Sequence, residues 1–508
     1  MPLKHSSHTA DDKTFRTDHL KAYIGVNTAR GSLITFAWHG LKFVVGIGAT
    51  AVMARLLTPE DYGLIGMVAV ITLYISMFKD MGLSLATVQR SEITYEQVST
   101  LFWINLTLSL TLTVITSALA PGIAWFYREP RLTAITVVTT IGFLLGGLSI
   151  QHEALLKRQM RFSALGLIGF LAMLLGYVVG ILMAWRGYGY WALVGSQLGL
   201  IGTNTILVWF VCGWIPGLPS RHSGVRPMLS LGQNITGFAM LNVFARNIDV
   251  LVIGRQLGAQ PLGFYAKAYQ LISLPTDNTN EPLNTVALPA LSRLTDDPAR
   301  YRHAYLRMLE QVALVTMPCV AIMFAASDWL VQLILGPQWG QTALVLSFLA
   351  ISGLLYPVTN SALWLLISQG RGRDMFRWAL LGAPLSILSY FIGLRWGVTG
   401  VAASYSFARL LAIDPLLYVY AGRTGPVRTR DIYRSTLPFV AASVCGALVC
   451  LAFRHYVNVS RPLVGFICSV LLVALTDILI LGALPAGRAA IKDLAHTLML
   501  TIGRRAAR

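Results

Sequence analysis

Long apolar runs separated by short polar gaps set the strongest constraint on what this chain can fold into. An α-helix needs about 20 mostly apolar residues to cross the hydrocarbon core of a bilayer. Fourteen stretches of roughly this length occur, and the gaps between them leave no room for a sizeable water-soluble domain. The predicted spans are 32–55, 63–88, 99–126, 132–156, 163–185, 189–212, 228–253, 262–290, 306–326, 341–367, 376–394, 399–420, 435–453 and 463–483. The sequence therefore predicts an all-α integral membrane protein.

The composition favours this class over a soluble one. Only 12% of the 508 residues are charged, whereas a soluble protein carries about a quarter. A large soluble enzyme with an unusually apolar core is the alternative, and the number of long apolar runs argues against it. The five cysteines lie in or beside apolar stretches and show no metal-ligand spacing. We expect no metal, no cofactor and no catalytic residue.

The distribution of Lys and Arg among the gaps predicts the topology, because cytoplasmic loops of membrane proteins carry an excess of both. With the N-terminus in the cytoplasm, 27 of these residues fall on the cytoplasmic side and 8 on the other. This bias predicts an even number of spans with both termini in the cytoplasm. A net charge of +18 can also indicate nucleic-acid binding. Here the cations lie in gaps between apolar runs, so we expect no nucleic-acid partner.

A repeat divides the sequence. The stretch ARLLTPEDYGL follows the first span and GRQLGAQPLGF follows the seventh, so that Arg55 matches Arg255 and Gly63 matches Gly263 at a constant offset of 200. Two six-helix bundles of the same orientation are predicted, as in transporters with parallel repeats; chance similarity between apolar segments is the alternative. The predicted divisions are a cytoplasmic N-terminal arm (1–31), a first six-helix bundle (32–212), a cytoplasmic linker (213–227), a second six-helix bundle (228–420), two additional transmembrane helices (421–484) and a basic cytoplasmic tail (485–508).

Several motifs carry a family resemblance. The stretches ARLLTPEDYGLIGM (54–67), LSLATVQR (83–90), FYREPRL (126–132), DVLVIGRQLGAQPLGFYAKAYQL (249–271) and LGPQW (335–339) resemble Wzx-type polysaccharide flippases of the WzxC-like branch. That branch belongs to the multidrug/oligosaccharidyl-lipid/polysaccharide (MOP) exporter superfamily. The resemblance runs from about residue 32 to 420, and the last two helices match only in kind.

The resemblance implies a function as well as a fold. It implies two six-helix bundles around a central cavity that opens to each side of a bacterial inner membrane in turn. The implied cargo is an oligosaccharide linked to undecaprenyl diphosphate, used to build exopolysaccharide or lipopolysaccharide. The polysaccharide polymerase and glycosyltransferases of the same pathway are expected partners, alongside the membrane lipids.

Charged residues inside the predicted spans are the candidate site. A charge at the middle of a bilayer costs roughly 2.5–3.5 kcal/mol on insertion scales, so such residues are expected to face a wet cavity or a partner. The candidates for binding the cargo are Lys42, Lys79, Arg246, Asp249 and Lys267. The candidates for ion coupling or for a polar cavity wall are His39, Asp80, Asn242, Asp277 and Glu281.

Each candidate has a structural alternative. Arg246 and Asp249 are three residues apart and share a helix face, so they can also form a local ion pair that neutralises itself. The polar run 276–281 cannot face lipid. The prolines around it favour a broken helix, and a loop is the alternative. His39 is more often a structural hydrogen-bonding residue than a proton carrier.

Two other functions compete with the flippase. A cation-coupled multidrug exporter of the same superfamily usually carries cationic cargo, which a cavity lined by Lys and Arg disfavours. An integral-membrane sugar polymerase or transferase belongs to a different class. Such enzymes tend to have a large external loop or a catalytic His, and this sequence predicts neither.

Overall fold

The computed structural model describes residues 24–80, 82–90, 92–220, 247–485 and 487–493, without the side chains of 24–37, 39 and 276–286. Contacts within the chain group it into two compact units, which meet in sequence at Gly263 and Phe264. All regular structure in the described part is helical. This confirms the all-α prediction.

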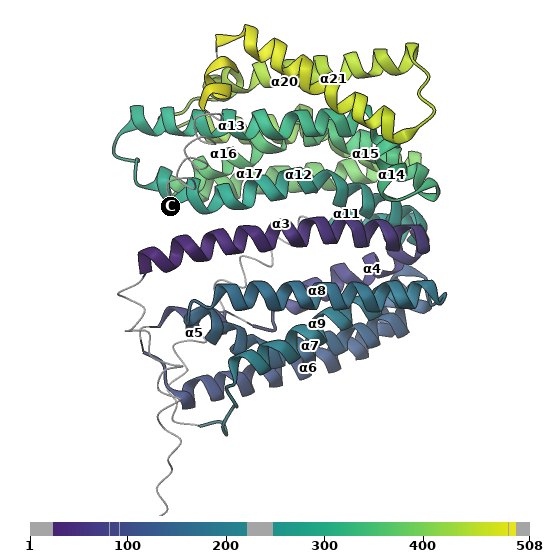
Figure 1. Ribbon diagram of the computed structural model, residues 1–508, viewed down its shortest axis with the longest axis vertical. Coiled ribbons are helices and arrows are strands. Elements are labelled where there is room, and N and C mark those ends of the chain that lie inside the picture. The colour runs from purple at the N-terminus through teal and green to yellow at the C-terminus, as the bar shows by residue number, and fades with distance from the viewer. Residues whose placement is uncertain (1–23, 81, 91, 221–246, 486, 494–508) are drawn as a thin grey trace, which may run out of the picture. The chain divides into compact units, whose positions relative to one another are not determined.

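The helices of the first unit include four long antiparallel neighbours, α6 to α9, that lie side by side (Figure 1). In chain order its helices are α3 (Ile24–Leu56), α4 (Pro59–Ser76), α5 (Leu83–Gln89), α6 (Tyr95–Tyr127), α7 (Arg131–Arg158), α8 (Phe162–Trp185), α9 (Trp191–Cys212), α11 (Ile248–Leu257) and the beginning of α12 (Ala259–Ser292). Helix α3 packs against α8.

The second unit contains the rest of α12 and all later helices. These are α13 (Pro298–Ala325), α14 (Ser327–Ile334), a 3-10 turn (Pro337–Trp339), α15 (Gly340–Gly353), α16 (Tyr356–Ser368), α17 (Gly372–Gly393), a 3-10 turn (Leu394–Trp396), α18 (Gly397–Ala408), a π-helical turn (Arg409–Ile413), α19 (Asp414–Gly422), α20 (Thr429–Tyr456) and α21 (Pro462–Ala483). Helices α20 and α21 pack against each other and against α13.

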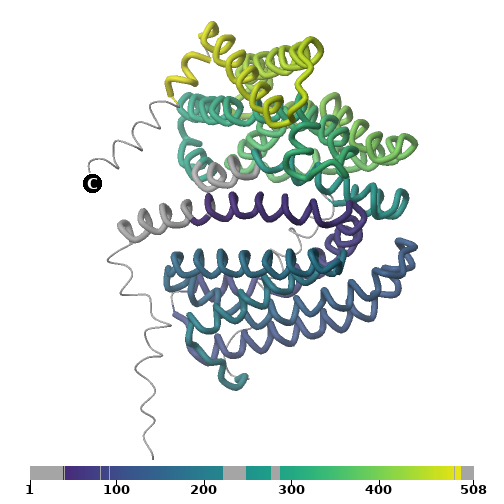
Figure 2. The backbone as a smooth tube through the Cα atoms, turned by 45° about the vertical axis from the view of Figure 1, so that its right-hand side comes forward, coloured from purple at the N-terminus to yellow at the C-terminus, as the bar shows by residue number. Residues whose placement is uncertain are grey.

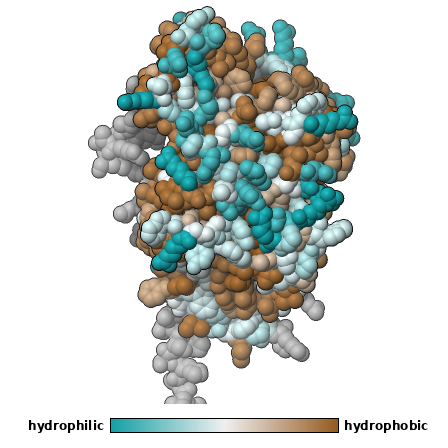
Figure 3. All heavy atoms as spheres, turned by 90° about the vertical axis from the view of Figure 1, so that its right-hand side faces the viewer, coloured by the Kyte–Doolittle hydropathy of each residue, from teal (hydrophilic) through white to brown (hydrophobic). Residues whose placement is uncertain are grey.

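Local sequence explains where several helices begin. Thr58 and Asp61 form a reciprocal capping box, and Pro59 occupies the first turn of α4, where its missing N–H costs nothing. Thr94 and Gln97 form the same kind of box at the start of α6. Such caps fix the helix ends, and polar helix ends are expected at the bilayer surface. In Figure 3, which views the right-hand side of Figure 1, hydrophilic residues lie among hydrophobic ones.

The number of spans differs from the prediction. Eight described helices are long and apolar enough to cross a membrane, or up to ten if each of two bent pairs is one span, so the count of fourteen is not confirmed. One of the eight, Gly372–Gly422, is 51 residues long. A straight helix of that length would measure about 75 Å, more than twice the bilayer core. A Cβ at Gly393 would lie 2.5 Å from the carbonyl oxygen of Gly400, so the stretch folds back on itself.

Two predicted spans differ in shape. The span 63–88 is two helices, because α4 ends at Ser76 and α5 begins at Leu83 after a turn in which Gly82 adopts φ +72°. The segment 262–290 was expected to break at its prolines, and this is wrong for the backbone, since α12 runs without interruption from Ala259 to Ser292. The three prolines of the segment 262–290 (Pro275, Pro282 and Pro289) are seven residues apart, so the missing N–H groups fall on one helix face.

The repeated sequence corresponds to a reciprocal contact inside the first unit. A Cβ at Gly63 would collide with the carbonyl oxygen of Ala259, and a Cβ at Gly263 would collide with that of Pro59. Positions 59 and 259, like 63 and 263, are equivalent in the repeat. The beginnings of α4 and α12 therefore cross backbone to backbone, and only glycine fits at either position.

Glycines also allow the close packing of α8 and α9. A Cβ at Gly176 would lie 2.8 Å from the carbonyl oxygen of Ser196, and one at Gly199 would lie 3.5 Å from the Cα of Gly176. Small residues spaced four apart let transmembrane helices approach closely. The glycine pairs of these two helices are packing residues.

Candidate functional site

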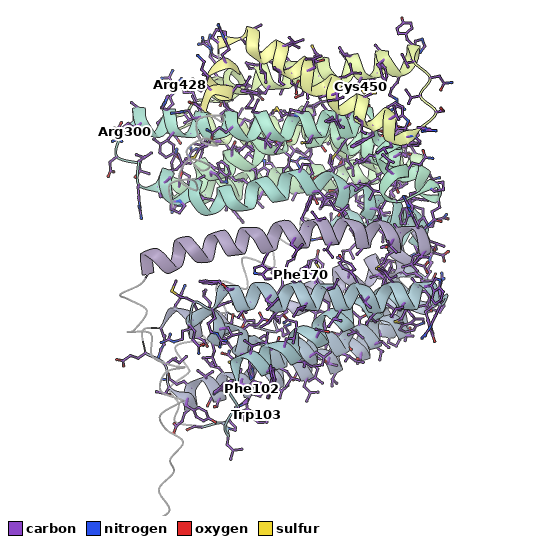
Figure 4. All side chains as sticks on the ribbon, in the orientation of Figure 1. Phe102, Trp103, Phe170, Arg300, Arg428 and Cys450 are labelled. Atoms are coloured by element: carbon purple, nitrogen blue, oxygen red, sulfur yellow. The ribbon has the colours of Figure 1, made fainter. Side chains whose placement is uncertain are left out.

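Lys42 lies in a groove that glycine creates on α8. Its Nζ is 2.5 Å from the place that a Cβ of Gly169 would occupy, so a larger residue at 169 would displace the ammonium group. One turn earlier, Trp38 occupies the space above Gly166 and lies 5.4 Å from the ring of Phe170, which Figure 4 labels on α8. The lysine is half-buried, and its stem is held by the α3–α8 packing.

Lys79 lies in the turn between α4 and α5, over another glycine. A Cβ at Gly146 of α7 would collide with its Nζ. The ammonium group interacts electrostatically with the carboxylates of Glu153 and Asp80. Two successive glycines, Gly146 and Gly147, open this part of α7, and the second accommodates Ser109 of α6.

Asp80 shapes the turn that holds Lys79. Its Oδ1 accepts the backbone N–H of Ser84 at 2.9 Å, its Oδ2 accepts the Ser84 hydroxyl at 2.5 Å, and the Asn105 amide donates to Oδ1 at 3.4 Å. The carboxylate thus satisfies the first turn of α5. Asp80 positions the turn and makes no ion pair with its neighbour in the described structure.

The ammonium groups of Lys42 and Lys79 have neither a hydrogen-bond nor an ion-pair partner among the described residues. Two arginines near helix ends, by contrast, have carboxylate partners. Arg131 bonds Glu60 and Glu129, and Arg302 binds Asp431 through two hydrogen bonds. Two half-buried cations with free donors can accept an anion, such as a phosphate oxygen, without first losing a protein partner.

Asp249 is buried in the first turn of α11. Its Oδ1 accepts the N–H of Val250 at 2.9 Å, and its charge interacts with Tyr74 of α4. Its predicted companions Arg246 and Asn242 lie outside the described residues, as do the side chains of His39, Asp277 and Glu281. The predicted pairing of Arg246 with Asp249 stays a prediction.

Lys267 belongs to the second unit, on α12. It is 7% exposed, and its Nζ donates to Oε1 of Gln270, one helical turn later, at 2.9 Å. Its environment therefore differs from that of Lys42, which is half-buried over a glycine and makes no bond to an amide. The structure places Lys42, Lys79 and Asp249 in one unit and Lys267 in the other.

The second unit contains a buried ion pair between Arg409 and Asp414. Asp414 is fully buried, and its Oδ1 accepts from both Nη2 (2.8 Å) and Nε (3.2 Å) of Arg409, whose guanidinium lies 5.9 Å from the rings of Tyr356 and Tyr405. Residues five apart point in different directions on an α-helix, but the π-helical turn at Arg409–Ile413 brings them together. No sequence signal announced this turn.

The motif FYREPRL (126–132) spans the loop between α6 and α7, and Arg131 of this motif is hydrogen-bonded to α4. Arg131 donates from Nε to Glu129 at 2.7 Å and from Nη2 to Glu60 at 2.5 Å. These bonds hold the pKa of the Glu129 carboxyl below its ordinary value. The described residues include no cluster of three or more metal-ligating side chains, and their five cysteines are free.

The long apolar helices define a multi-pass helical membrane protein. A solved lipid II flippase MurJ in an inward closed conformation matches with a TM-score of 0.70 and 13% identity, covering 89% of this chain and 98% of that one. An inward-facing multidrug resistance MATE transporter of the MOP superfamily matches with a TM-score of 0.58 and 13% identity, over 76% and 94% of the two chains.

The family follows from the sequence comparison. A family model described as "Polysaccharide biosynthesis protein" matches residues 52–344. The chain belongs to this polysaccharide biosynthesis family, the Wzx-like transport proteins, which are not enzymes. The predicted resemblance is thereby confirmed, and the sugar polymerase or transferase alternative is wrong.

Curated relatives lie at moderate identity. The teichuronic acid biosynthesis protein TuaB of Bacillus subtilis is 29% identical over 64% of this chain and 68% of its own length. The lipopolysaccharide biosynthesis protein WzxC of Escherichia coli is 25% identical over 72% and 76%. The succinoglycan biosynthesis transport protein ExoT of Rhizobium meliloti is 24% identical over 82% and 84%.

Proposed function

We propose that this transporter moves oligosaccharide repeat units, linked to undecaprenyl diphosphate, from the inner to the outer leaflet of a bacterial inner membrane by alternating access. The observation that carries the proposal is that the ammonium groups of Lys42 and Lys79, both in the first unit, make no hydrogen bond or ion pair with any described residue. The relatives named for teichuronic acid, lipopolysaccharide and succinoglycan biosynthesis support a cargo of this class.

The physical problem that such a protein solves is the desolvation of a polar head group. Each charge and hydroxyl taken into hydrocarbon without a partner costs several kcal/mol. A lysine ammonium that bonds a diphosphate oxygen makes a charge-assisted hydrogen bond worth about 1.5–3 kcal/mol. Lysines with no competing carboxylate in bonding distance can make that bond when the cargo enters and release it afterwards.

The proposal includes the topology of fourteen spans, two six-helix bundles followed by two additional helices, and both termini in the cytoplasm. Single cysteines at Gln338 and Gly372, both exposed, separate the predicted sides. An impermeant thiol reagent added outside intact cells should label position 338 and spare position 372. Equal labelling of both positions would rule this topology out.

A cation-coupled multidrug exporter is the second candidate, and the fold similarity to a MATE transporter is its support. Free ammonium groups repel a cationic drug, so Lys42 and Lys79 favour the anionic cargo. Arg246, Asp249 and Lys267 are further candidates for binding the cargo, and His39, Asp80, Asn242, Asp277 and Glu281 are candidates for ion coupling or for a polar cavity wall.

Deletion of the gene tests the proposed function directly. Complete, unpolymerised lipid-linked repeat units should accumulate on the cytoplasmic leaflet, with loss of extracellular polymer and unchanged drug sensitivity. Complete units on the outer leaflet would point to a polymerisation defect and contradict the proposal. Normal polymer with heightened sensitivity to cationic drugs would instead establish the multidrug exporter.

A further inference from the structure

The chain that leaves α9 folds back onto α6 at the start of the predicted linker (213–227). Residues 213–220 (GWIPGLPS), here named the docked segment, are not helical, and they follow the end of α9 in the teal part of the tube in Figure 2. The segment ends at Ser220, the last described residue before 247. Its prolines and glycines exclude a continued helix.

Side chains of α6 satisfy the backbone of the docked segment. Tyr95 Oη donates to the Ile215 carbonyl at 2.9 Å, and Trp103 Nε1 donates to the Gly217 carbonyl at 2.7 Å. The Gly217 N–H donates to Ser99 Oγ at 3.0 Å, and the Ser220 N–H donates to Thr100 Oγ1 at 3.1 Å. The four α6 residues share a helix face, since they span two turns at helical spacing.

The inner side of the docked segment is fixed by an aromatic cluster. Trp214 is 4% exposed and packs against Phe102, which Figure 4 labels next to Trp103 on α6. Its ring also lies 4.9 Å from that of His152, whose Nε2 is 3.1 Å from the Trp214 carbonyl oxygen. The segment is therefore held in place through both its backbone and one buried ring.

The outer side of the same segment is apolar and uncovered. Ile215 is 73% exposed and Leu218 is 85% exposed. A water-exposed loop needs no side-chain donors for its carbonyls, whereas an irregular segment in an apolar environment must have its backbone groups satisfied by protein. The docked segment makes four hydrogen bonds with α6 and has aliphatic side chains on its outer side, as expected of an irregular segment in an apolar environment.

The surroundings of the docked segment indicate the polar boundary of the bilayer. Tyr95 and Trp103 are each about one third exposed, as in the aromatic belts at membrane interfaces. Arg161 is exposed and donates to the Val211 carbonyl at 3.1 Å, so positive charge beside the segment is available to lipid phosphate. Aliphatic side chains beside cations are the pattern of an interfacial anchor.

We propose that the docked segment is an in-plane membrane anchor. Ile215 and Leu218 insert between the head groups and acyl chains of the leaflet that the charge bias predicts to be cytoplasmic. The anchor ties the start of the linker to the membrane surface beside α6. It does not depend on the identity of the cargo, so it stands or fails independently of the proposed function.

The experiment is fluorescence quenching in proteoliposomes of the full chain, reconstituted in phosphatidylethanolamine and phosphatidylglycerol. A bimane probe is attached at Leu218→Cys in a background without the five native cysteines, and Ile215→Cys provides a second probe position. Glu92→Cys is the matched control, because Glu92 is exposed in the polar loop just before α6. Brominated lipids should remove roughly half of the emission at 218 and 215, with little loss at 92.

Aqueous iodide should show the reverse order. Quenching of positions 218 and 215 by iodide at the level of position 92 would overturn the anchor, because the segment would then lie in water. Protection from both quenchers would also overturn it, since another protein surface would then cover the segment. The double variant Tyr95→Phe, Trp103→Phe removes two docking bonds and should shift the 218 probe from lipid to iodide quenching. Unchanged lipid quenching in that variant would contradict the role of the docking bonds.

Discussion

Two lysines of the first unit, Lys42 and Lys79, differ in their hydrogen-bond partners from Lys267 and Arg409 of the second unit. Lys42 and Lys79 are half-buried over glycines and have no hydrogen-bond partner among the described residues. In the second unit, Lys267 is bound to Gln270, and Arg409 is bound to a fully buried Asp414. The comparison teaches that the presence of a cation within an apolar stretch of sequence does not by itself show whether the cation binds a ligand or stabilises the fold. A cation that is hydrogen-bonded within the fold stabilises it, whereas one with free N–H donors is available to a ligand.

The largest expected effect on stability comes from breaking the ion pair between Arg409 and Asp414. Asp414→Ala leaves the Arg409 charge, 13% exposed, without its partner. Removal of one member of a buried pair costs roughly 3–5 kcal/mol. The thermal unfolding midpoint in detergent and the amount of inserted protein should both fall sharply. The double variant Arg409→Met, Asp414→Leu should recover most of the loss, and a double variant as unstable as the single would show that the charge pair is not the cause.

The reciprocal glycine crossing gives the next largest effect. Gly63→Ala drives a Cβ into the Ala259 carbonyl, which cannot rotate away, and overpacking of this kind costs about 1–3 kcal/mol. Gly66→Ala is the matched control, since its Cβ would meet only the Leu262 side chain at 3.6 Å. Unfolding in detergent should separate the two variants. Equal stability would mean that the crossing is looser than the structure has it.

A smaller effect on stability is expected for the ion pair of Arg131 and Glu129, because both side chains are partly exposed. Glu129 has a pKa below its usual value of about 4.3 because Arg131 bonds it, so its contribution is present above that pH and lost as the pH falls through the lowered pKa. Surface pairs of this kind contribute about 0.2–1 kcal/mol. Glu129→Gln should lower the unfolding midpoint slightly at about pH 7, and the difference from the parent protein should shrink as the pH falls through the lowered pKa. A larger effect of the variant at the lower pH would contradict this sign.

The sequence allowed prediction of the membrane class, the family and the approximate helix positions, because each rests on the length of apolar runs or on motifs. The pairing of Arg409 with Asp414 could not be predicted, since it needs a π-helical turn that no residue pattern specifies. The break between α4 and α5 was missed because Asp80 and Gly82 lie within an otherwise apolar run. The position of Lys79 over Gly146 is a tertiary contact between segments 67 residues apart, beyond the reach of local patterning.

The measurement that tests the central claim most directly is polymer export by cells carrying Lys42→Ala, Lys79→Ala or both, normalised to the amount of protein in the membrane. Loss of one charge-assisted hydrogen bond of about 1.5–3 kcal/mol corresponds to roughly a 10- to 150-fold effect on binding. Export should therefore fall at least tenfold in the double variant while the unfolding midpoint in detergent is retained. Lys492→Ala removes an exposed lysine near the C-terminal end of the described chain and should export normally. Normal export by the double variant at normal protein levels would contradict the claim that the free ammonium groups bind the cargo.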